Sequence, residues 1–188
     1  MKNALAHMLA DSPVIAAVKS EAQLEACLRS PCRVVFLLFG DICGLPALVA
    51  RAKAGGRAAL VHVDLIGGLA PKEVAMDFIA QNTAADGIVS TRPNLIRRAR
   101  ELGLVTVLRV FAIDSMAVES LKRERQLAGP DLIEVMPGAI PKVIRRIRDS
   151  VDTPLIAGGL LTDKEDALNA LGAGALAIST SCEALWRA

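Results

Sequence analysis

Two short apolar runs near the C-terminus each end in small polar residues. The first run ends at Gly158 and Gly159, and the second, about one strand-helix unit later, ends in Ser179, Thr180 and Ser181. Glycine lets a backbone approach a ligand closely, and hydroxyl groups donate hydrogen bonds. In a (β/α)8 barrel the loops after strands seven and eight commonly bind phosphate through backbone N–H groups. Each run alone also fits an ordinary turn, but together they predict a phosphate site.

Further polar residues follow other apolar runs at the points where we expect strands to end. Cations there could neutralise a phosphate, and the two carboxylates could accept hydrogen bonds from substrate hydroxyls, which describes a small phosphorylated polyol. An equally open interpretation is that Arg109 simply pairs with Glu134 on the neighbouring strand, and a buried pair at the mouth can do both. The candidate contacts are Lys19, Asp64, Arg92, Arg109, Glu134 and Gly138.

The elements that must position these residues are apolar runs alternating with helical segments. The expected strands are Val14–Val18, Val34–Leu38, Ala59–Leu65, Gly87–Ser90, Val105–Phe111, Leu132–Met136, Leu155–Gly158 and Ala175–Thr180. The expected helices are Ser20–Leu28, Pro71–Gln81, Asn94–Leu102, Asp114–Leu127, Ala139–Arg148 and Asp163–Leu171. Near-continuous apolar strands that alternate with helices predict parallel pairing.

Eight such units without a break in composition predict one domain over residues 1–188, a compact (β/α)8 barrel of the TIM type. The chain of 188 residues is short for this fold, so some helices must be short or missing. Only residues 182–188 follow the eighth run, which predicts a last helix of one or two turns. Residues 1–12 are expected to form a short helical arm. Within the strands, period-two alternation places His62 and Asp64 on one face.

Composition restricts the function classes. The net charge is only +2, which gives no global argument for nucleic acid, and no apolar run approaches the length of a membrane span. The four cysteines lack zinc-site spacing, and the only histidines are His7 and His62, so we expect reduced thiols, no metal site and a cytoplasmic protein. His62 is expected to be a hydrogen-bonded barrel residue rather than a ligand or a base.

Several segments resemble the glycerol-3-phosphate-responsive antiterminator family, the glycerol uptake operon regulators. They are Val61–Leu69, Gly87–Arg92, Leu108–Ser115, Ile133–Gly138 and Ile178–Ser181, with Leu185 and Trp186. The resemblance spans nearly the whole chain. It implies a barrel that binds glycerol 3-phosphate as its effector, without a cofactor, and acts on leader mRNA to prevent premature transcription termination in glycerol-utilisation operons. Arg92 is a departure, because a lysine is expected there, and an arginine offers a planar fork in place of a point charge.

The enzyme alternative is a phosphate-sugar epimerase or an aldolase-like barrel acting on a small polyol or triose phosphate. The segment Val61–Asp64 looks like the metal-binding strand of ribulose-phosphate epimerases, but two histidines cannot assemble their metal centre. Without a metal, Asp64 and Glu134 could still move protons. We favour a sensor with no catalytic residues, which binds its ligand without consuming it.

An RNA partner requires a basic patch, and three consecutive expected helices carry basic clusters that could merge into one ridge. Charged outer faces are normal for barrel helices, and Glu101 and Glu124 offset part of the charge. Aromatic residues make up 3% of the chain, which disfavours base stacking, so recognition would depend on phosphates and RNA shape. We expect no DNA or membrane partner. The RNA-binding candidates are Arg97, Arg98, Arg100, Lys122, Arg123, Arg125, Lys142, Arg145, Arg146 and Arg148.

Self-association is a third possibility. The short end after Cys182 should leave the wall near the first and last strands thinly covered. An apolar surface there would attract a second subunit or the N-terminal arm. A homo-oligomer is therefore a possible state of the protein.

Overall fold

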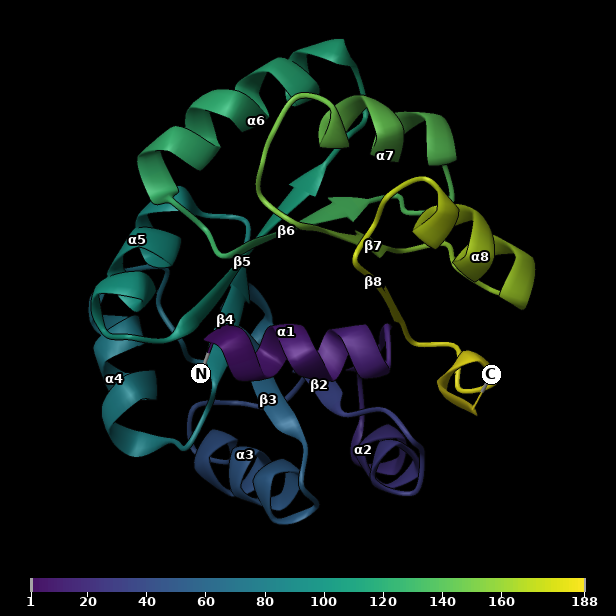
Figure 1. The fold of residues 1–188 in the computed structure, drawn as a ribbon. Coiled ribbons are helices and arrows are strands. Elements are labelled where there is room, and N and C mark those ends of the chain that lie inside the picture. The colour runs from purple at the N-terminus through teal and green to yellow at the C-terminus, as the bar shows by residue number, and fades with distance from the viewer. Residues whose placement is uncertain (1, 188) are drawn as a thin grey trace.

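The fold is a closed barrel of eight parallel strands in sequence order, and β1 pairs with β8 to complete it (Figure 1). The computed structural model describes residues 2–187, apart from the side chains of residues 2–4 and 115. The expected (β/α)8 barrel is therefore confirmed. The strands are β1 (Val14–Val18), β2 (Val34–Leu37), β3 (Ala58–His62), β4 (Gly87–Ser90), β5 (Val105–Phe111), β6 (Leu132–Met136), β7 (Leu155–Gly158) and β8 (Ala177–Thr180).

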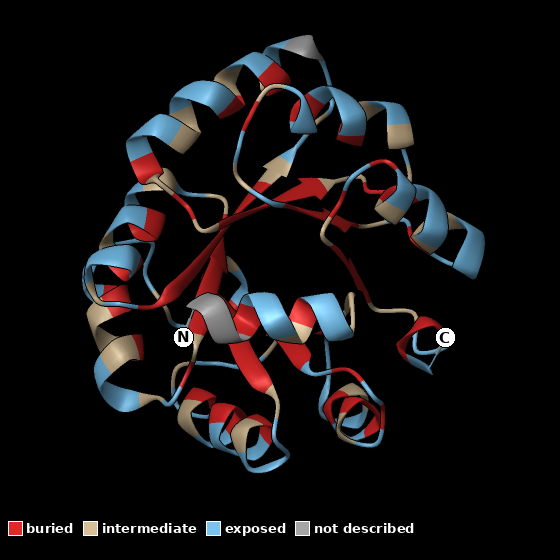
Figure 2. Ribbon diagram, viewed as in Figure 1, coloured by how far each residue is buried: buried red, intermediate tan, exposed pale blue. Residues whose placement is uncertain are grey.

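Helices surround the barrel, and their outer faces are exposed while the strands are buried (Figure 2). None of the helices in the described chain is long and apolar enough to cross a bilayer. The helices are α1 (Lys2–Asp11), α2 (Glu21–Leu28), α3 (Leu45–Ala54), α4 (Val74–Asn82), α5 (Pro93–Glu101), α6 (Ser115–Ala128), α7 (Pro141–Arg148) and α8 (Lys164–Gly172), with the 3-10 turns η1 (Val63–Leu65) and η2 (Leu185–Arg187).

Local sequence explains where these helices begin. The side chains of Ser20, Asp114 and Asp163 each accept a hydrogen bond from a backbone N–H in the first turn of α2, α6 and α8. Helices α3, α5 and α7 instead have proline in the first turn, where its missing N–H costs nothing. Six of the seven α-helices that follow a strand therefore have a defined start, and α4 has neither a side-chain cap nor a proline.

Two elements differ from the sequence-based expectation. Helix α3 was not predicted, because its first residues follow a glycine-rich turn and its only charges, Arg51 and Lys53, lie in the last turn. The expected strand Ala59–Leu65 ends at His62, and the chain then turns into η1. Asp64 therefore lies on a 3-10 turn, so the expectation that it shares a strand face with His62 is wrong.

The lower half of the barrel interior, at the N-terminal ends of the strands, is apolar. Inward-facing residues such as Phe36, Leu60 and Ile156 form one buried cluster. Helix α1 lies across this end, nearest the viewer in Figure 1, and adds Leu5 and Leu9 to the cluster. The N-terminal arm thus closes the barrel from below, and burial of its two leucines holds it there.

The last sector of the wall is covered by η2 in place of a full helix. Trp186 is fully buried, and its indole Nε1 donates a hydrogen bond to the backbone oxygen of Thr180 at 2.8 Å. Leu185 is buried beside it. The expectation of a last helix of one or two turns is met by this single 3-10 turn.

Candidate functional site

A cavity of about 620 Å³ opens at the C-terminal ends of the strands. Side chains from β1, β5, β6 and β8 and the loop after β7 meet there, so the barrel brings together residues that are far apart in the sequence. The candidate residues that line it are Lys19, Arg109, Glu134, Gly159, Ser179, Thr180 and Ser181. The candidates Asp64, Arg92, Gly138 and Gly158 are not part of its lining.

The floor of the cavity is a buried ion pair. Arg109 and Glu134 are register partners on β5 and β6, and Arg109 Nε donates to Glu134 Oε2 at 2.5 Å. The hydroxyl of Ser179 donates to Oε1 of the same carboxylate. The Glu134 side chain is 0% exposed and the Arg109 side chain 9% exposed. Both carboxylate oxygens are therefore occupied by protein donors.

This arrangement changes what Glu134 can do. A carboxylate with both oxygens bonded inside the protein is poorly placed to accept hydrogen bonds from substrate hydroxyls, and it acts instead by orienting Arg109. Within the described residues only Nε of Arg109 is bonded, so its two terminal nitrogens remain available to a ligand in the cavity. The pairing that sequence reasoning left open is present.

Gly158 shapes the floor rather than approaching a ligand. A Cβ at this position would lie 2.5 Å from Glu134 Oε1 and 2.8 Å from Ser179 Oγ. Only glycine leaves room for the carboxylate and the hydroxyl to meet. The contact between Glu134 and Ser179 thus depends on a missing side chain on β7.

The hydroxyls at the end of β8 are mostly used within the protein. Ser179 donates to Glu134, and Thr180 Oγ1 donates to the backbone oxygen of Leu161 at 2.9 Å. Ser181 makes no side-chain hydrogen bond within the described chain. Of the three hydroxyl donors predicted for a phosphate, only Ser181 keeps its hydrogen free in this structure.

Three backbone N–H groups at the cavity are free to donate hydrogen bonds. Gly159 and Leu160 have φ values of +76° and +58°, and Leu160 is the only non-glycine residue with positive φ in the described chain. Among residues 2–187, no hydrogen bond is made by the N–H groups of Gly159, Leu160 and Ser181, which all line the cavity. A bulky residue in the left-handed region is strained, and such strain is concentrated at ligand sites.

Asp64 forms a separate clasp between β3 and β4. Its carboxylate accepts hydrogen bonds from the hydroxyls of Ser90 and Thr91 and from the backbone N–H of Thr91, and Arg92 Nε lies 3.4 Å from it. The structure does not bring Asp64 and Arg92 to the cavity. The clasp fixes the ends of two neighbouring strands, which is a structural use of the carboxylate.

His62 lies in the same polar layer of the barrel interior as Arg109. The side chain is 3% exposed, and Nδ1 is buried with no hydrogen-bond partner, 3.9 Å from Asp64 Oδ2. Burial, together with the nearby Arg109 charge, lowers the pKa of His62 to about 4. The imidazole is therefore neutral at neutral pH. His62 is thus the buried barrel residue that was expected, but its Nδ1 has no hydrogen-bond partner among the described residues, and no sequence signal reveals this.

Metal and disulfide chemistry find no support in the described residues. Within 2–187 there is no group of three or more His, Cys, Asp or Glu side chains arranged to hold a metal ion. Cys27, Cys32, Cys43 and Cys182 are free thiols, and burial raises the pKa of Cys27 to about 11.

The three basic clusters lie on neighbouring outer helices. Helix α5 packs against α6, and Arg125 of α6 contacts Thr153 and Asp152 just beyond α7 (Figure 1). Acidic residues neutralise four of the ten candidates: Arg97, Arg98, Arg125 and Arg148. The other six form no ion pair in the described structure: Arg100, Lys122, Arg123, Lys142, Arg145 and Arg146.

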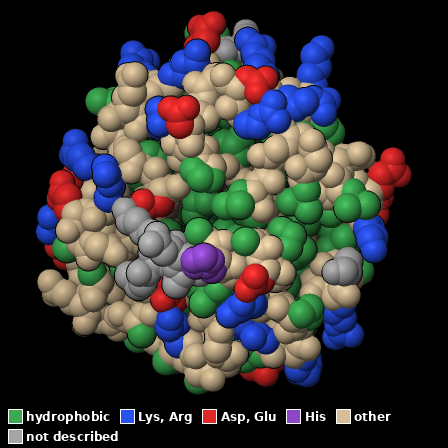
Figure 3. All heavy atoms as spheres, viewed as in Figure 1, with side chains coloured by type: hydrophobic (Ala, Val, Ile, Leu, Met, Phe, Trp, Pro, Cys, Tyr) green, Lys and Arg blue, Asp and Glu red, His purple; other side chains and the backbone are tan. Residues whose placement is uncertain are grey.

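Many of these cations lie in last helical turns, at the end of the barrel opposite the cavity. Figure 3 views this end and shows Lys and Arg side chains along its edge over α6 and α7, with acidic side chains between them. Cations at a helix C-terminus stabilise the helix dipole, so part of the basic pattern has a purely structural cause.

Comparison with known proteins places the chain in a family. Residues 14–186 match the family model described as "Glycerol-3-phosphate responsive antiterminator". The chain is similar to the Uncharacterized protein YgcP of Escherichia coli (strain K12), with 40% identity over 97% of this chain and 95% of that protein.

Two solved structures are similar over nearly their whole length. The glycerol uptake operon antiterminator regulatory protein of Listeria monocytogenes (strain 4b F2365) has a TM-score of 0.90 and 34% identity, covering 94% of this chain and 95% of that one. A glycerol uptake operon antiterminator-related protein of Thermotoga maritima MSB8 has a TM-score of 0.82 and 36% identity, covering 92% and 96%. The resemblance inferred from the sequence segments is confirmed.

Proposed function

Because the chain belongs to the glycerol-3-phosphate-responsive antiterminator family, we propose that it binds glycerol 3-phosphate in the barrel mouth and acts on the leader mRNA of glycerol-utilisation operons. The observation that carries this proposal is the family match over residues 14–186, and the chemistry of the mouth cavity supports it. Two cations, Lys19 and Arg109, line that cavity, and its one carboxylate is already paired. Such a site favours an anion over a neutral polyol.

The phosphate would sit in a cup formed by the ends of β7 and β8. The free backbone N–H groups of Gly159, Leu160 and Ser181 and the hydroxyl of Ser181 are donors there. Lys19, which directly follows β1, adds a positive charge. The terminal nitrogens of Arg109 would hold the phosphate or donate to the glycerol hydroxyls from the floor.

The ligand would be released unchanged. Proton transfer needs a group whose acid or base position is free and whose pKa lies near the operating pH. In the cavity floor both oxygens of Glu134 accept protein hydrogen bonds, and the pKa of His62 is lowered to about 4. These side chains suit binding better than catalysis, which supports a sensor.

A thermal-unfolding panel tests the ligand. Binding to the folded state raises the unfolding temperature by mass action, so glycerol 3-phosphate should raise it in a concentration-dependent way, while glycerol and inorganic phosphate should raise it much less. Equal shifts from every phosphorylated compound would reduce the site to a general anion site. Phosphorus NMR of the same mixtures checks for turnover, and any new phosphate signal would contradict the sensor.

The RNA surface would be a ridge across α5, α6 and α7, formed by the six cations without ion pairs. Reversing Arg145 and Arg146 to Glu should weaken leader-RNA binding and reduce its salt dependence, by about 2 in the logarithmic slope if both contact phosphates. Arg148 is spared because it pairs with Asp149. The matched control reverses Arg29 and Arg187, two exposed arginines away from the ridge. Equal losses in both variants would place the RNA elsewhere.

One backbone connection could carry the signal between the two sites. The N–H of Gly138 donates to the backbone oxygens of Gly158 and Gly159, at 2.5 and 3.1 Å, and α7 begins three residues later at Pro141. The cup is thus tied to the start of the helix that holds Arg145 and Arg146. For the ligand to act, the RNA-binding state must bind it more tightly than the other state does.

A further inference from the structure

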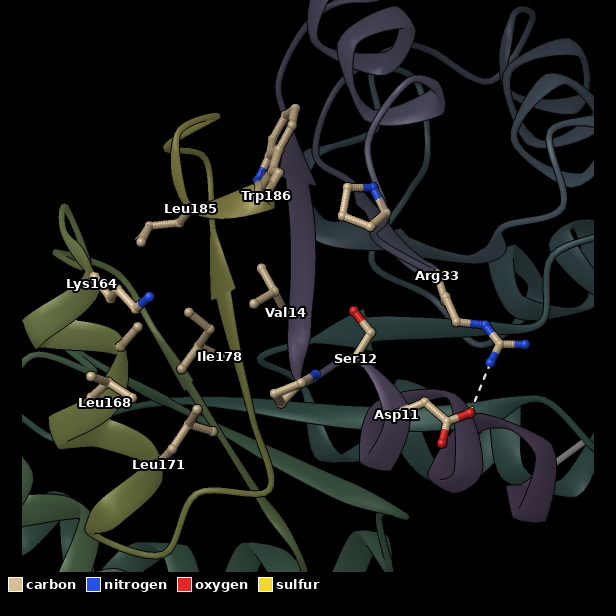
Figure 4. Close-up of a pocket in the computed structure, with 13 residues that line it drawn as sticks. Asp11, Ser12, Val14, Arg33, Lys164, Leu168, Leu171, Ile178, Leu185 and Trp186 are labelled. Carbon is tan, nitrogen blue, oxygen red and sulfur yellow. Dashed lines mark hydrogen bonds and ion pairs between the residues drawn. The ribbon is translucent and has the colours of Figure 1, made fainter. Parts of the chain in front are cut away.

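Trp186, the only tryptophan of the chain, is buried beside the mouth cavity without lining it. It belongs to η2 and packs against β1 (Figure 4). A buried tryptophan usually bonds its indole N–H, because an unpaired donor in a dry interior is costly. Here Nε1 donates to the backbone oxygen of Thr180 at 2.8 Å. Trp186 therefore holds one backbone carbonyl at the end of β8.

That carbonyl belongs to the same peptide unit as the N–H of Ser181, which the cup requires as a donor. The unit is trans and planar, so its C=O and its N–H point in opposite directions. Because Trp186 holds the Thr180 oxygen on the β1 side of β8, the N–H of Ser181 points to the β7 side. Gly159 and Leu160 line the cavity on that side. Trp186 thus aims a donor that it does not touch.

The neighbouring polar groups of this segment are also bonded within the protein. Thr180 Oγ1 accepts a hydrogen bond from the N–H of Cys182 at 3.0 Å, and the backbone oxygen of Cys182 accepts one from the N–H of Leu185 at 3.1 Å. The backbone oxygen of Ser181 accepts one from Gln23 Nε2 at 3.4 Å, the longest of these contacts. This set of contacts leaves the N–H and the hydroxyl of Ser181 for a ligand.

Gln23 links this segment to the other side of the cup. Its Oε1 accepts a hydrogen bond from the backbone N–H of Lys19 at 2.8 Å. In a capping box, a glutamine at this third helical position bonds the N-cap residue, which here is Ser20, but Gln23 bonds the residue before it. The two partners also define the orientation of the amide, because an N–H requires Oε1 and a carbonyl requires Nε2. One side chain therefore holds the backbone of both Lys19 and Ser181.

We propose, on the premise that the mouth binds glycerol 3-phosphate, that Trp186 and Gln23 form an outer brace that positions Ser181 and Lys19 for the phosphate. Neither brace residue lines the cavity, so both act through the backbone that they hold. A donor that is already positioned loses less entropy when the ligand binds. An anion on the Ser181 N–H also polarises the peptide, which makes the Thr180 oxygen a better acceptor for the indole. The brace and the ligand therefore stabilise each other.

Nitrogen-15 NMR of the wild-type protein tests this polarisation. One tryptophan gives one indole Nε1–H signal, which needs no further assignment. Saturation with glycerol 3-phosphate should move the indole proton and the Ser181 amide proton downfield, because both hydrogen bonds strengthen. An indole signal that stays in place while calorimetry shows binding would overturn the brace and leave the proposed function intact. Absence of binding in calorimetry would overturn both.

A substitution at Trp186 gives a second measurement. Trp186→Phe keeps a buried ring but removes the donor, so the affinity for glycerol 3-phosphate should fall about tenfold. Phe36→Leu is the matched control, because it removes part of another fully buried ring in the lower barrel and should lower stability at unchanged affinity. Calorimetry below the unfolding transition of each variant measures both. Equal affinity of Trp186→Phe and wild type would overturn the brace.

The contribution of Gln23 is tested separately. Gln23→Met has a similar length but neither end of the amide, and it should weaken binding of glycerol 3-phosphate about fivefold, because two backbone segments lose a partner. Gln126→Met makes the same change at an exposed position of α6 and should bind as wild type does. Gln23→Met binding as tightly as Gln126→Met would overturn the part assigned to Gln23.

Discussion

The two halves of the barrel interior have the same geometry and opposite chemistry. In the lower half, inward-facing positions are filled by Val, Leu, Ile and Phe side chains and sealed by Leu5 and Leu9 of the arm. In the upper half, the next inward-facing positions hold His62, Arg109, Glu134 and Ser179, all buried. The same strands carry both layers. Because residues two positions apart on a strand point to the same side, each strand contributes one residue to the lower layer and the next inward-facing residue to the upper layer.

The apolar layer and the polar layer contribute differently to the free energy of folding. Apolar burial below contributes favourable free energy for every side chain added, whereas a buried ion pair must first overcome the loss of hydration. A buried pair is therefore weak evidence for stability by itself. The pair lies directly under the mouth cavity, which fits the proposed role of Arg109 in binding a ligand.

The largest expected effect comes from breaking the upper layer. Glu134→Ala leaves Arg109 buried without its partner, and we expect a loss of about 3–5 kcal/mol in the free energy of unfolding, measured by urea denaturation. Replacing both Arg109 and Glu134 by Met should recover most of that stability, because no buried charge remains, while binding of glycerol 3-phosphate is abolished. A double variant that still binds the ligand would show that the pair is structural only.

A smaller and simpler effect is expected in the lower layer. Leu9 is fully buried at the bottom of the barrel. Leu9→Ala should lower the free energy of unfolding by about 2–5 kcal/mol, through lost burial and the cavity left behind. Calorimetry should show unchanged affinity for glycerol 3-phosphate at a temperature where the variant is folded. A change in affinity equal to that of an Arg109 variant would mean that the two layers are not independent.

The third effect concerns His62 and pH. Its pKa is lowered from 6.5 to about 4, so the unfolded chain takes up a proton before the folded chain does. The stability contribution is therefore complete above pH 6.5 and is lost as pH falls towards 4, at up to about 1.4 kcal/mol per pH unit. Carboxylates also titrate in this range, so the quantity to measure is the difference between wild type and His62→Gln. Parallel curves for the two proteins would show that His62 is not shifted.

The sequence was sufficient for the barrel and for most strand boundaries, because hydrophobic periodicity determines both. It was insufficient for α3, whose apolar face lacks the opposite charged face that makes helical periodicity visible. Gly159, Ser181, Arg109 and Lys19 line the mouth cavity, and their contact with a ligand stays a prediction. The sequence did not reveal that the hydroxyls of Ser179 and Thr180 form hydrogen bonds inside the protein, because this depends on the directions of the side chains. It also did not reveal the strain at Leu160, because this depends on the backbone angles.

Pairing of β1 with β8 has a consequence for synthesis of the chain. Ile15 and Ala16 are register partners of Ser179 and Thr180, so the edge of β1 in a nascent chain stays unpaired until β8 has left the ribosome. The same residues complete the mouth cavity. A chain that stops before β8 would therefore expose an unpaired strand edge and would also lack this side of the cavity.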